Sequence, residues 1–252
     1  MRVMRIPNVH GLIKRRLLVN FRANPQVVQK LLPAPFKPKF QAGYAIIGIC
    51  LIRLENIRMI GVPSLLGISS ENAAHRVAVE WTNEKGEPCE GVFIPRRDTS
   101  SWFNRMVGGR IFPGEHQGAD FEITDKEGKI DFQMRSHDKT ADIFVKGSES
   151  AAFPASSCFP SLAASSEFFK RGCLGYSVTS NPKKLDGLEL CTTAWNVGAL
   201  EVQEVRSSYF ENRAIFPAGS VEFDHALIMR DLEHEWHQAE DMVVQPEPAA
   251  VR

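Results

Sequence analysis

An imidazole beside a carboxylate is the first candidate for chemistry in this sequence. Glu115 and His116 are adjacent and lie between Gly114 and Gly118, which leave the backbone open to a ligand. A neighbouring carboxylate can hold a histidine near a pKa that suits proton transfer. The pair therefore predicts acid/base catalysis by Glu115 and His116. The alternative is a solvent-exposed pair in a loop.

Arginines close to this loop could bind an anion. The planar guanidinium of Arg110 can hold a substrate carboxylate through two parallel hydrogen bonds, and its alternative role is to cap a helix that ends at Val107. Arg96 and Arg97 form a second candidate for the same task. The family resemblance described below favours Arg110 as the residue that binds the substrate.

A strand and a short helix should position these groups. Residues 92–94 are apolar and are followed by Pro95, which we expect to end a strand. Asp98 or Thr99 can serve as the N-cap of a helix with Trp102 on its apolar face, and the helix should stop at the glycines 108–109. The candidate loop follows directly.

Several short motifs resemble the acetoacetate decarboxylase-like superfamily, in particular its uncharacterised DUF2071-type branch. That branch carries a Gly-Arg pair and then an aromatic-Pro pair after a short helix, as in Gly109-Arg110 and Phe112-Pro113 here. The helix ending LLPAP at 31–35, the serines at 207–208 and the segments 216–217 and 221–224 match further parts of the superfamily. The resemblance spans residues 12–228.

The resemblance implies further site residues. Lys14 falls where the decarboxylases keep a substrate-binding arginine, although it also belongs to a basic segment that could simply be solvated. Glu71 falls where an acidic residue at the start of a strand lies in the active site, and its alternative is an exposed strand end. Trp102 and Phe112 are expected to line the same pocket.

The reaction of the decarboxylases is not expected here. In those enzymes two lysines follow the aromatic-Pro pair and one forms a Schiff base, whereas this sequence has Gly114, Glu115 and His116. The nearest lysines, Lys85 and Lys126, lie in predicted exposed turns, where an amine keeps a pKa of about 10.4. Two functions stay open: a lyase-type enzyme that acts on a small carboxylate or keto compound by acid/base chemistry, and a non-catalytic ligand-binding or structural barrel.

The remaining pattern predicts a mainly antiparallel β fold of the α+β class. Residues 45–54 form an apolar segment typical of a central strand, and alternating or apolar segments recur at 17–21, 71–82, 119–123, 130–134, 141–145, 188–195 and 200–208. Helices should begin after Asn24 and at Ser161. We expect one domain over 1–252, a cone-shaped barrel or strongly curved sheet with a few short helices, and a disordered tail from about 246.

Composition narrows the class of protein. Thirty basic residues balance thirty acidic ones, so no general attraction to nucleic acid is expected. The five cysteines form no C-x-x-C pair, and no apolar segment approaches the ~18 residues of a membrane span, which favours a cytoplasmic protein. His234 and His237 lack a recognisable third metal ligand, and no nucleotide motif occurs, so neither metal nor cofactor is expected. Whether the protein forms a homo-oligomer stays open. His225 is expected to be a hydrogen-bonded core residue.

Overall fold

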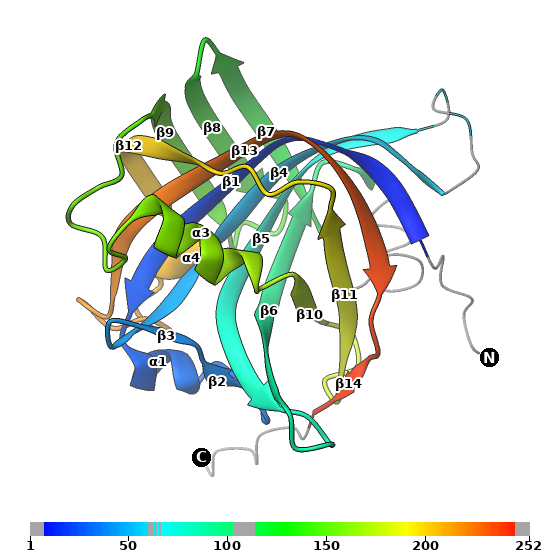
Figure 1. The fold of residues 1–252 in the computed structure, drawn as a ribbon, viewed down its shortest axis with the longest axis vertical. Coiled ribbons are helices and arrows are strands. Elements are labelled where there is room, and N and C mark those ends of the chain that lie inside the picture. The colour runs from blue at the N-terminus through cyan, green and yellow to red at the C-terminus, as the bar shows by residue number, and fades with distance from the viewer. Residues whose placement is uncertain (1–7, 60–62, 64, 66, 103–113, 245–252) are drawn as a thin grey trace.

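The described part of the chain is built mainly from β-strands (Figure 1). The computed structural model describes residues 8–59, 63, 65, 67–102 and 114–244. The longer strands are β1 (Asn8–Ala23), β4 (Tyr44–Met59), β5 (Ile68–Thr82), β6 (Pro88–Thr99), β7 (Gln117–Lys126), β8 (Lys129–Ser136), β9 (Asp142–Ser150), β11 (Lys184–Thr192), β12 (Gly198–Ser207) and β13 (Val221–Gln238). The shorter ones are β2 (Lys37–Pro38), β3 (Phe40–Gln41), β10 (Leu174–Val178) and β14 (Met242–Val243).

Helices are few and short within the described residues. They are α1 (Pro25–Gln29), α3 (Leu162–Lys170) and α4 (Ser208–Glu211). Asn24 caps α1, where Pro25 takes the first position, and the Ser161 hydroxyl caps α3 by accepting from the Ala164 amide at 3.2 Å. Both capped starts were expected from the sequence, and the mainly β fold is confirmed. No helix in the described residues is long and apolar enough to cross a membrane.

Strands β6 and β13 each pair with three neighbours, and the sheet therefore closes into two rings. Strands β13, β1, β4, β5 and β6 are hydrogen-bonded neighbours in that order. Strands β7, β8, β9 and β12 lead from β6 back to β13 and complete a closed barrel, the nine-strand ring. Strands β10 and β11 also lead from β6 to β13, and this shorter closure forms the seven-strand ring. Strands β13, β1, β4, β5 and β6 therefore belong to both rings.

The shared strands are buried on both faces because each face lines a different ring. All nine strands of the larger ring contribute to one apolar cluster, to which β1 gives Leu17 and Val19. Leu18, between them, packs instead with Phe168 and Phe169 of α3. An apolar segment without alternation is typical of such a strand, as residues 45–54 indicated for β4. The alternation in residues 71–82 is typical of a half-buried strand, but β5 is also buried on the face of Arg76, which is 5% exposed.

The end of β6 also differs from the prediction. The strand does not stop at Pro95 but continues to Thr99, so Asp98 and Thr99 are strand residues and not helix caps. Pro95 is tolerated because the pairing of β5 with β6 shifts register between His75 and Val77, and a proline fits where a ladder hydrogen bond is interrupted. The helix expected to follow lies mostly outside the described residues.

The last third of the chain holds two more differences. Strand β10 was not expected, and β11 begins at Lys184 and not at 188. Residues 234–237 were weighed as a helical pair of histidines, but they belong to β13, where side chains three residues apart point to opposite faces. His225 is 1% exposed and hydrogen-bonded, as predicted.

Candidate functional site

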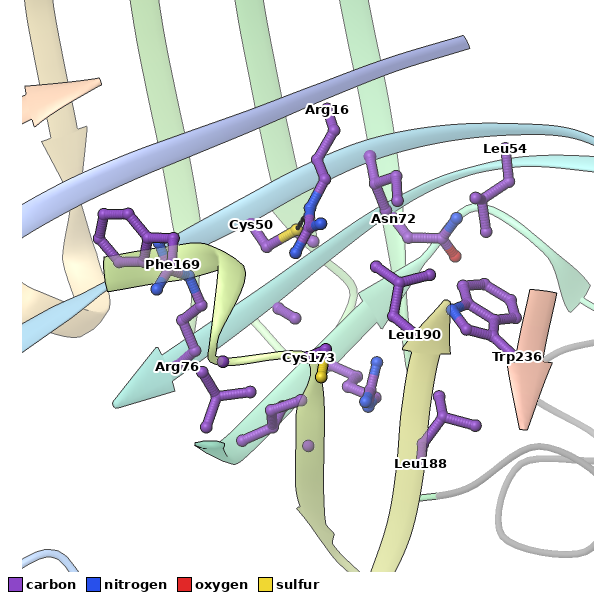
Figure 2. A pocket seen from close by; sticks show the side chains of 18 of the residues that line it. Arg16, Cys50, Leu54, Asn72, Arg76, Phe169, Cys173, Leu188, Leu190 and Trp236 are labelled. Atoms are coloured by element: carbon purple, nitrogen blue, oxygen red, sulfur yellow. Dashed lines mark hydrogen bonds between the residues drawn. The ribbon is translucent and has the colours of Figure 1, made fainter. Parts of the chain in front are cut away.

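A cavity of about 130 Å³ lies inside the seven-strand ring. Such a volume holds on the order of ten water molecules, and so a ligand of about ten non-hydrogen atoms. Much of its wall is apolar and comes from β4, β6, β11 and β13: Ile52, Leu54, Val92, Ile94, Leu188, Leu190 and Trp236. Figure 2 shows Leu54, Leu188, Leu190 and Trp236 around one space with polar side chains such as Asn72.

Three arginines from adjacent strands line this cavity: Arg16 of β1, Arg76 of β5 and Arg97 of β6. None of them forms an ion pair with a carboxylate of the described residues. A buried guanidinium without a counter-charge is costly, because desolvation is not offset by attraction. The three groups therefore mark a place for an anion.

Arg76 is the most deeply buried of the three. Its guanidinium lies over the Phe169 ring, 4.6 Å from the centroid, and donates to the Asn20 amide oxygen. Its Nε has no hydrogen-bond partner in the described structure. Burial lowers the pKa of Arg76 to about 10, which still leaves the group charged at neutral pH. Arg76 thus presents an unsatisfied donor within the cavity wall.

Arg97 and Arg16 repeat this arrangement with neutral partners. Arg97 Nε donates to the Ser177 hydroxyl at 2.9 Å, and burial lowers the pKa of Arg97 to about 10, which Asp186 opposes. Arg16 Nε donates to the Cys50 sulfur at 3.4 Å, and its buried Nη1 has no partner among the described residues. Figure 2 shows the Arg16 and Cys50 side chains pointing toward each other.

One carboxylate, Asp98, also lines the cavity, but its charge is already matched. Arg96 donates to both oxygens of Asp98, at 2.7 Å from Nη2 and 2.9 Å from Nε. The same guanidinium binds Asp138 at 3.0 Å. Asp98 therefore does not neutralise the three arginines, and the described cavity carries an excess of positive charge.

His116 lines the cavity beside Arg97. Burial and the Arg97 charge lower the pKa of His116 to about 3, and its Nδ1 lies 3.3 Å from the Gly114 carbonyl oxygen. The imidazole is therefore neutral at physiological pH. Glu115, expected to tune it, is exposed and does not belong to the described cavity wall.

Glu71 lies on the other face of β5. Its neighbour Asn72 lines the cavity, whereas the Glu71 carboxylate accepts from Arg15 at 2.7 Å and lies 3.8 Å from Arg53. Arg15 in turn stacks on Phe132 of the nine-strand ring. Burial raises the pKa of the Glu71 carboxyl, and Arg15 opposes the shift. The structure therefore does not bring Glu71 and His116 to the same cavity.

Lys14 is also outside the cavity. It is 49% exposed and pairs with Asp231 at 2.6 Å, while Arg16, two residues further along β1, lines the cavity. The pairing of β1 with β4 shifts register between Ile13 and Arg15, which changes the face that each following residue occupies. Trp102 is 68% exposed, and Arg110 and Phe112 lie outside the described residues.

Sequence reasoning missed Arg16 and Arg76 and ranked Arg97 second. A usable signal was present for Arg76, because it lies in a mainly apolar part of β5, AAHRVAVEW. A basic residue within such a segment indicates either an exposed face or a cavity. The choice depends on the closure of β11 against β13, which is far away in sequence.

A buried network behind the cavity fixes the orientation of Arg76. Asn20 is fully buried, and because a guanidinium only donates, the Asn20 oxygen must face Arg76. The Asn20 nitrogen then faces His225 Nε2 at 3.1 Å, and His225 Nδ1 lies 2.6 Å from an Asp224 oxygen. The Ser165 hydroxyl lies 2.7 Å from the same Nε2. This network holds His225 as a neutral acceptor toward Asn20.

The closed barrel with its few short helices is that of an acetoacetate decarboxylase-like fold. The model of the DUF2071 family, described as an uncharacterized conserved protein, matches residues 13–223, and the chain belongs to this family. No curated protein sequence matches the chain.

Solved structures share the fold at low sequence identity. Acetoacetate decarboxylase from Legionella pneumophila is similar with a TM-score of 0.60 and 13% identity, over 97% of this chain and 90% of that one. An acetoacetate decarboxylase-like enzyme from Sphingomonas wittichii gives a TM-score of 0.62 and 11% identity, over 96% of both chains. The enduracididine biosynthesis enzyme MppR, complexed with pyruvate, gives 0.56 and 11%, over 95% and 91%. These likenesses establish the fold.

Proposed function

We propose that this protein binds a small carboxylate or keto compound in the cavity of the seven-strand ring and acts on it as a lyase-type enzyme without a Schiff base. The observation that carries the proposal is the set of three guanidinium groups on the cavity wall, the buried Arg76 and the half-buried Arg16 and Arg97, which have no carboxylate partner in the described structure. A carboxylate accepts from arginine in short, charge-assisted hydrogen bonds. The ligand would supply the missing negative charge.

The residues take different roles in this proposal. The three arginines hold the carboxylate, and the apolar wall of β4, β6 and β11 receives the body of the ligand. Burial and the Arg97 charge keep the His116 imidazole neutral, and a bound carboxylate would offset that charge, which would favour proton transfer from the bound molecule to His116. Arg110 and Phe112, close to Gly114 in sequence, remain predicted contributors. Pyruvate, bound in the structural neighbour MppR, belongs to the same chemical class.

The local backbone supports chemistry without an imine. No lysine occurs among the described residues of the cavity wall. Gly114, which follows the Phe-Pro pair, has a φ of +82°, and a Cβ placed there would lie 2.6 Å from the Ser177 Cβ. Its amide donates to Asp186 at 3.0 Å. A lysine at this position would require the loop to rearrange.

Calorimetric titration tests the proposal. Small carboxylates and keto acids should bind, whereas their neutral amides should not. Arg97→Gln should weaken binding about 10- to 100-fold, since a hydrogen bond to a charged group contributes about 1.5–3 kcal/mol. The matched control is Arg206→Gln, because Arg206 is exposed and lies over Phe144, outside the cavity. Equal affinities for the carboxylates and their amides would contradict the proposal.

A second function, a non-catalytic ligand-binding barrel, is separated by turnover. NMR spectra of each bound carboxylate, recorded over time with catalytic protein, should show product if the protein is an enzyme. Loss of product formation in His116→Gln with binding retained would assign the proton transfer to His116. Acetoacetate followed by borohydride should leave the mass of the intact chain unchanged, and an adduct on one lysine would return the protein to the Schiff-base class.

A further inference from the structure

A thiol lies among the three arginines. Cys50 of β4 is half-buried, lines the cavity, and accepts a hydrogen bond from Arg16 Nε at 3.4 Å (Figure 2). A negative charge on its sulfur would also favour the charged forms of both Arg76 and Arg97. The sulfur thus lines the same cavity as all three cations.

Cys173 provides a contrast within the same cavity. Its sulfur lies 3.9 Å from an oxygen of Glu189 and has a carboxylate where Cys50 has arginines. Burial and Glu189 raise the pKa of Cys173, so it stays a protonated thiol at neutral pH. Arg16 beside Cys50 attracts an anionic ligand, whereas the Glu189 carboxylate beside Cys173 repels one. The two cavity cysteines should therefore differ in reactivity.

The cavity also offers a place for the ligand beside Cys50. Arg76 is 5% exposed, lines the cavity, and its Nε has no partner in the described structure. The described cavity wall carries two thiols, those of Cys50 and Cys173. A carboxylate held by Arg76 and Arg16 would bring the carbon next to it toward the Cys50 sulfur.

We propose that Cys50 is a covalent nucleophile for 2-oxo carboxylates, an inference that rests on the proposed function of the cavity. The sulfur lone pair forms a bond to the ketone carbon, and the carbonyl π pair moves to its oxygen. That oxygen takes the proton that the thiol gave up, so the product is a hemithioketal and no co-reactant is needed. The addition is reversible.

This adduct differs from the imine of the decarboxylases in what it can do. A protonated imine draws electrons from the neighbouring bond and so promotes loss of carbon dioxide, whereas a hemithioketal has no such electron sink. Cys50 would instead capture the keto acid and hold its former carbonyl carbon in tetrahedral form. The bound carboxylate stays paired with the arginines throughout.

Bromopyruvate is the probe for this proposal. Its carboxylate and ketone match the expected ligand, and a thiolate displaces bromide to form a stable carbon–sulfur bond. At limiting reagent and neutral pH, peptide mapping should show Cys50 labelled at least about 10-fold faster than Cys173, the matched control in the same cavity. Pyruvate should protect Cys50. Neutral iodoacetamide should show a smaller preference, because it has no carboxylate for the arginines.

Two variants and one binding measurement make the outcomes distinct. Arg16→Gln should slow labelling of Cys50 about 10-fold without changing the rate at Cys173. With [2-¹³C]pyruvate, the wild-type protein should show a tetrahedral carbon signal that Cys50→Ser lacks. If wild-type protein binds lactate, which has no ketone, but labels Cys50 no faster than Cys173, the inference is overturned and the proposed function stands. If no carboxylate binds, the proposed function itself fails.

Discussion

The two faces of β5 differ in whether their buried cations are paired with carboxylates. Toward the nine-strand ring, Glu71 pairs with Arg15, and Asp125 links Arg15 to Arg230. Toward the cavity, Arg76 has only the Asn20 amide and the Phe169 ring as polar or aromatic partners in the described structure. Both faces bury cations, but among the described residues only the first supplies their counter-charges.

The difference separates structural charges from ligand-binding ones. A buried ion pair loses solvation and regains part of it by mutual attraction, so the chain needs both members. A buried cation with neutral partners loses solvation energy, and no attraction to a counter-charge offsets the loss. Such a group is retained for a use other than stability. Position on one face or the other therefore predicts whether a substitution affects folding or binding.

The largest expected change in stability comes from removing the Glu71 charge on the paired face of β5. Glu71→Gln leaves Arg15, whose side chain is 5% exposed, without its closest carboxylate. We expect the free energy of unfolding to fall by about 3 kcal/mol, the lower end for a broken buried pair, because Asp125 still lies 3.5 Å from Arg15. Urea unfolding followed by tryptophan fluorescence measures this change.

Binding in the same variant decides the role that the family resemblance gave to Glu71. Because Glu71 lies outside the described cavity wall, the affinity for carboxylates should match that of the wild type once both proteins are folded. A loss of turnover larger than the loss of folded protein would instead place Glu71 in the reaction.

The second effect concerns a histidine on the face of Glu71. His75 is fully buried against Tyr209, with 4.5 Å between the ring centroids, and neither ring nitrogen has a partner among the described residues. Burial lowers the pKa of His75 from 6.5 to about 3. Between these values the unfolded chain binds a proton that the folded chain does not, so stability falls as the pH falls through this window. At pH 5 the loss is about 2 kcal/mol.

His75→Leu should remove that loss. The difference in unfolding free energy between pH 7 and pH 5 should shrink by about 2 kcal/mol relative to the wild type. His137→Gln is the control, since His137 is half-exposed next to Asp120. An unchanged pH dependence in His75→Leu would mean that protonated His75 donates to a hydrogen-bond acceptor that its position does not indicate.

Local signals in the sequence were sufficient for much of the fold. The Asn24-Pro25 start of α1, the Ser161 cap of α3 and the central strand β4 each depend on a few neighbouring residues. They could be predicted because capping chemistry and apolar periodicity act over one or two turns or one strand length. The mainly β class followed from the same local patterns.

The cavity could not be predicted in the same way. Arg76 is buried because β11 closes against β13, and Arg16 replaces Lys14 because the strand changes face near Ile13. Both causes are pairings between distant segments, and neither leaves a mark on the residues themselves. His116 was found because its glycine-rich loop is a local signal, although burial and the Arg97 charge, and not Glu115, lower the pKa of His116.

The smallest expected change in stability belongs to Arg76, and its direction carries the comparison. The fall in the pKa of Arg76 from 12.5 to about 10 corresponds to about 3 kcal/mol of disfavoured charge in the folded chain. Arg76→Met removes that charge and keeps the contact with Phe169, but it leaves the buried Asn20 oxygen without its donor, which costs about 2 kcal/mol. The unfolding free energy should therefore stay the same or rise by about 1 kcal/mol.

Carboxylate affinity should nevertheless fall about 10- to 100-fold in Arg76→Met, as expected when a charged donor is lost. Urea unfolding and calorimetry on one preparation give both values. A destabilisation as large as that of Glu71→Gln would show that Arg76 has a counter-charge within the chain, and the distinction between the two faces of β5 would then fail.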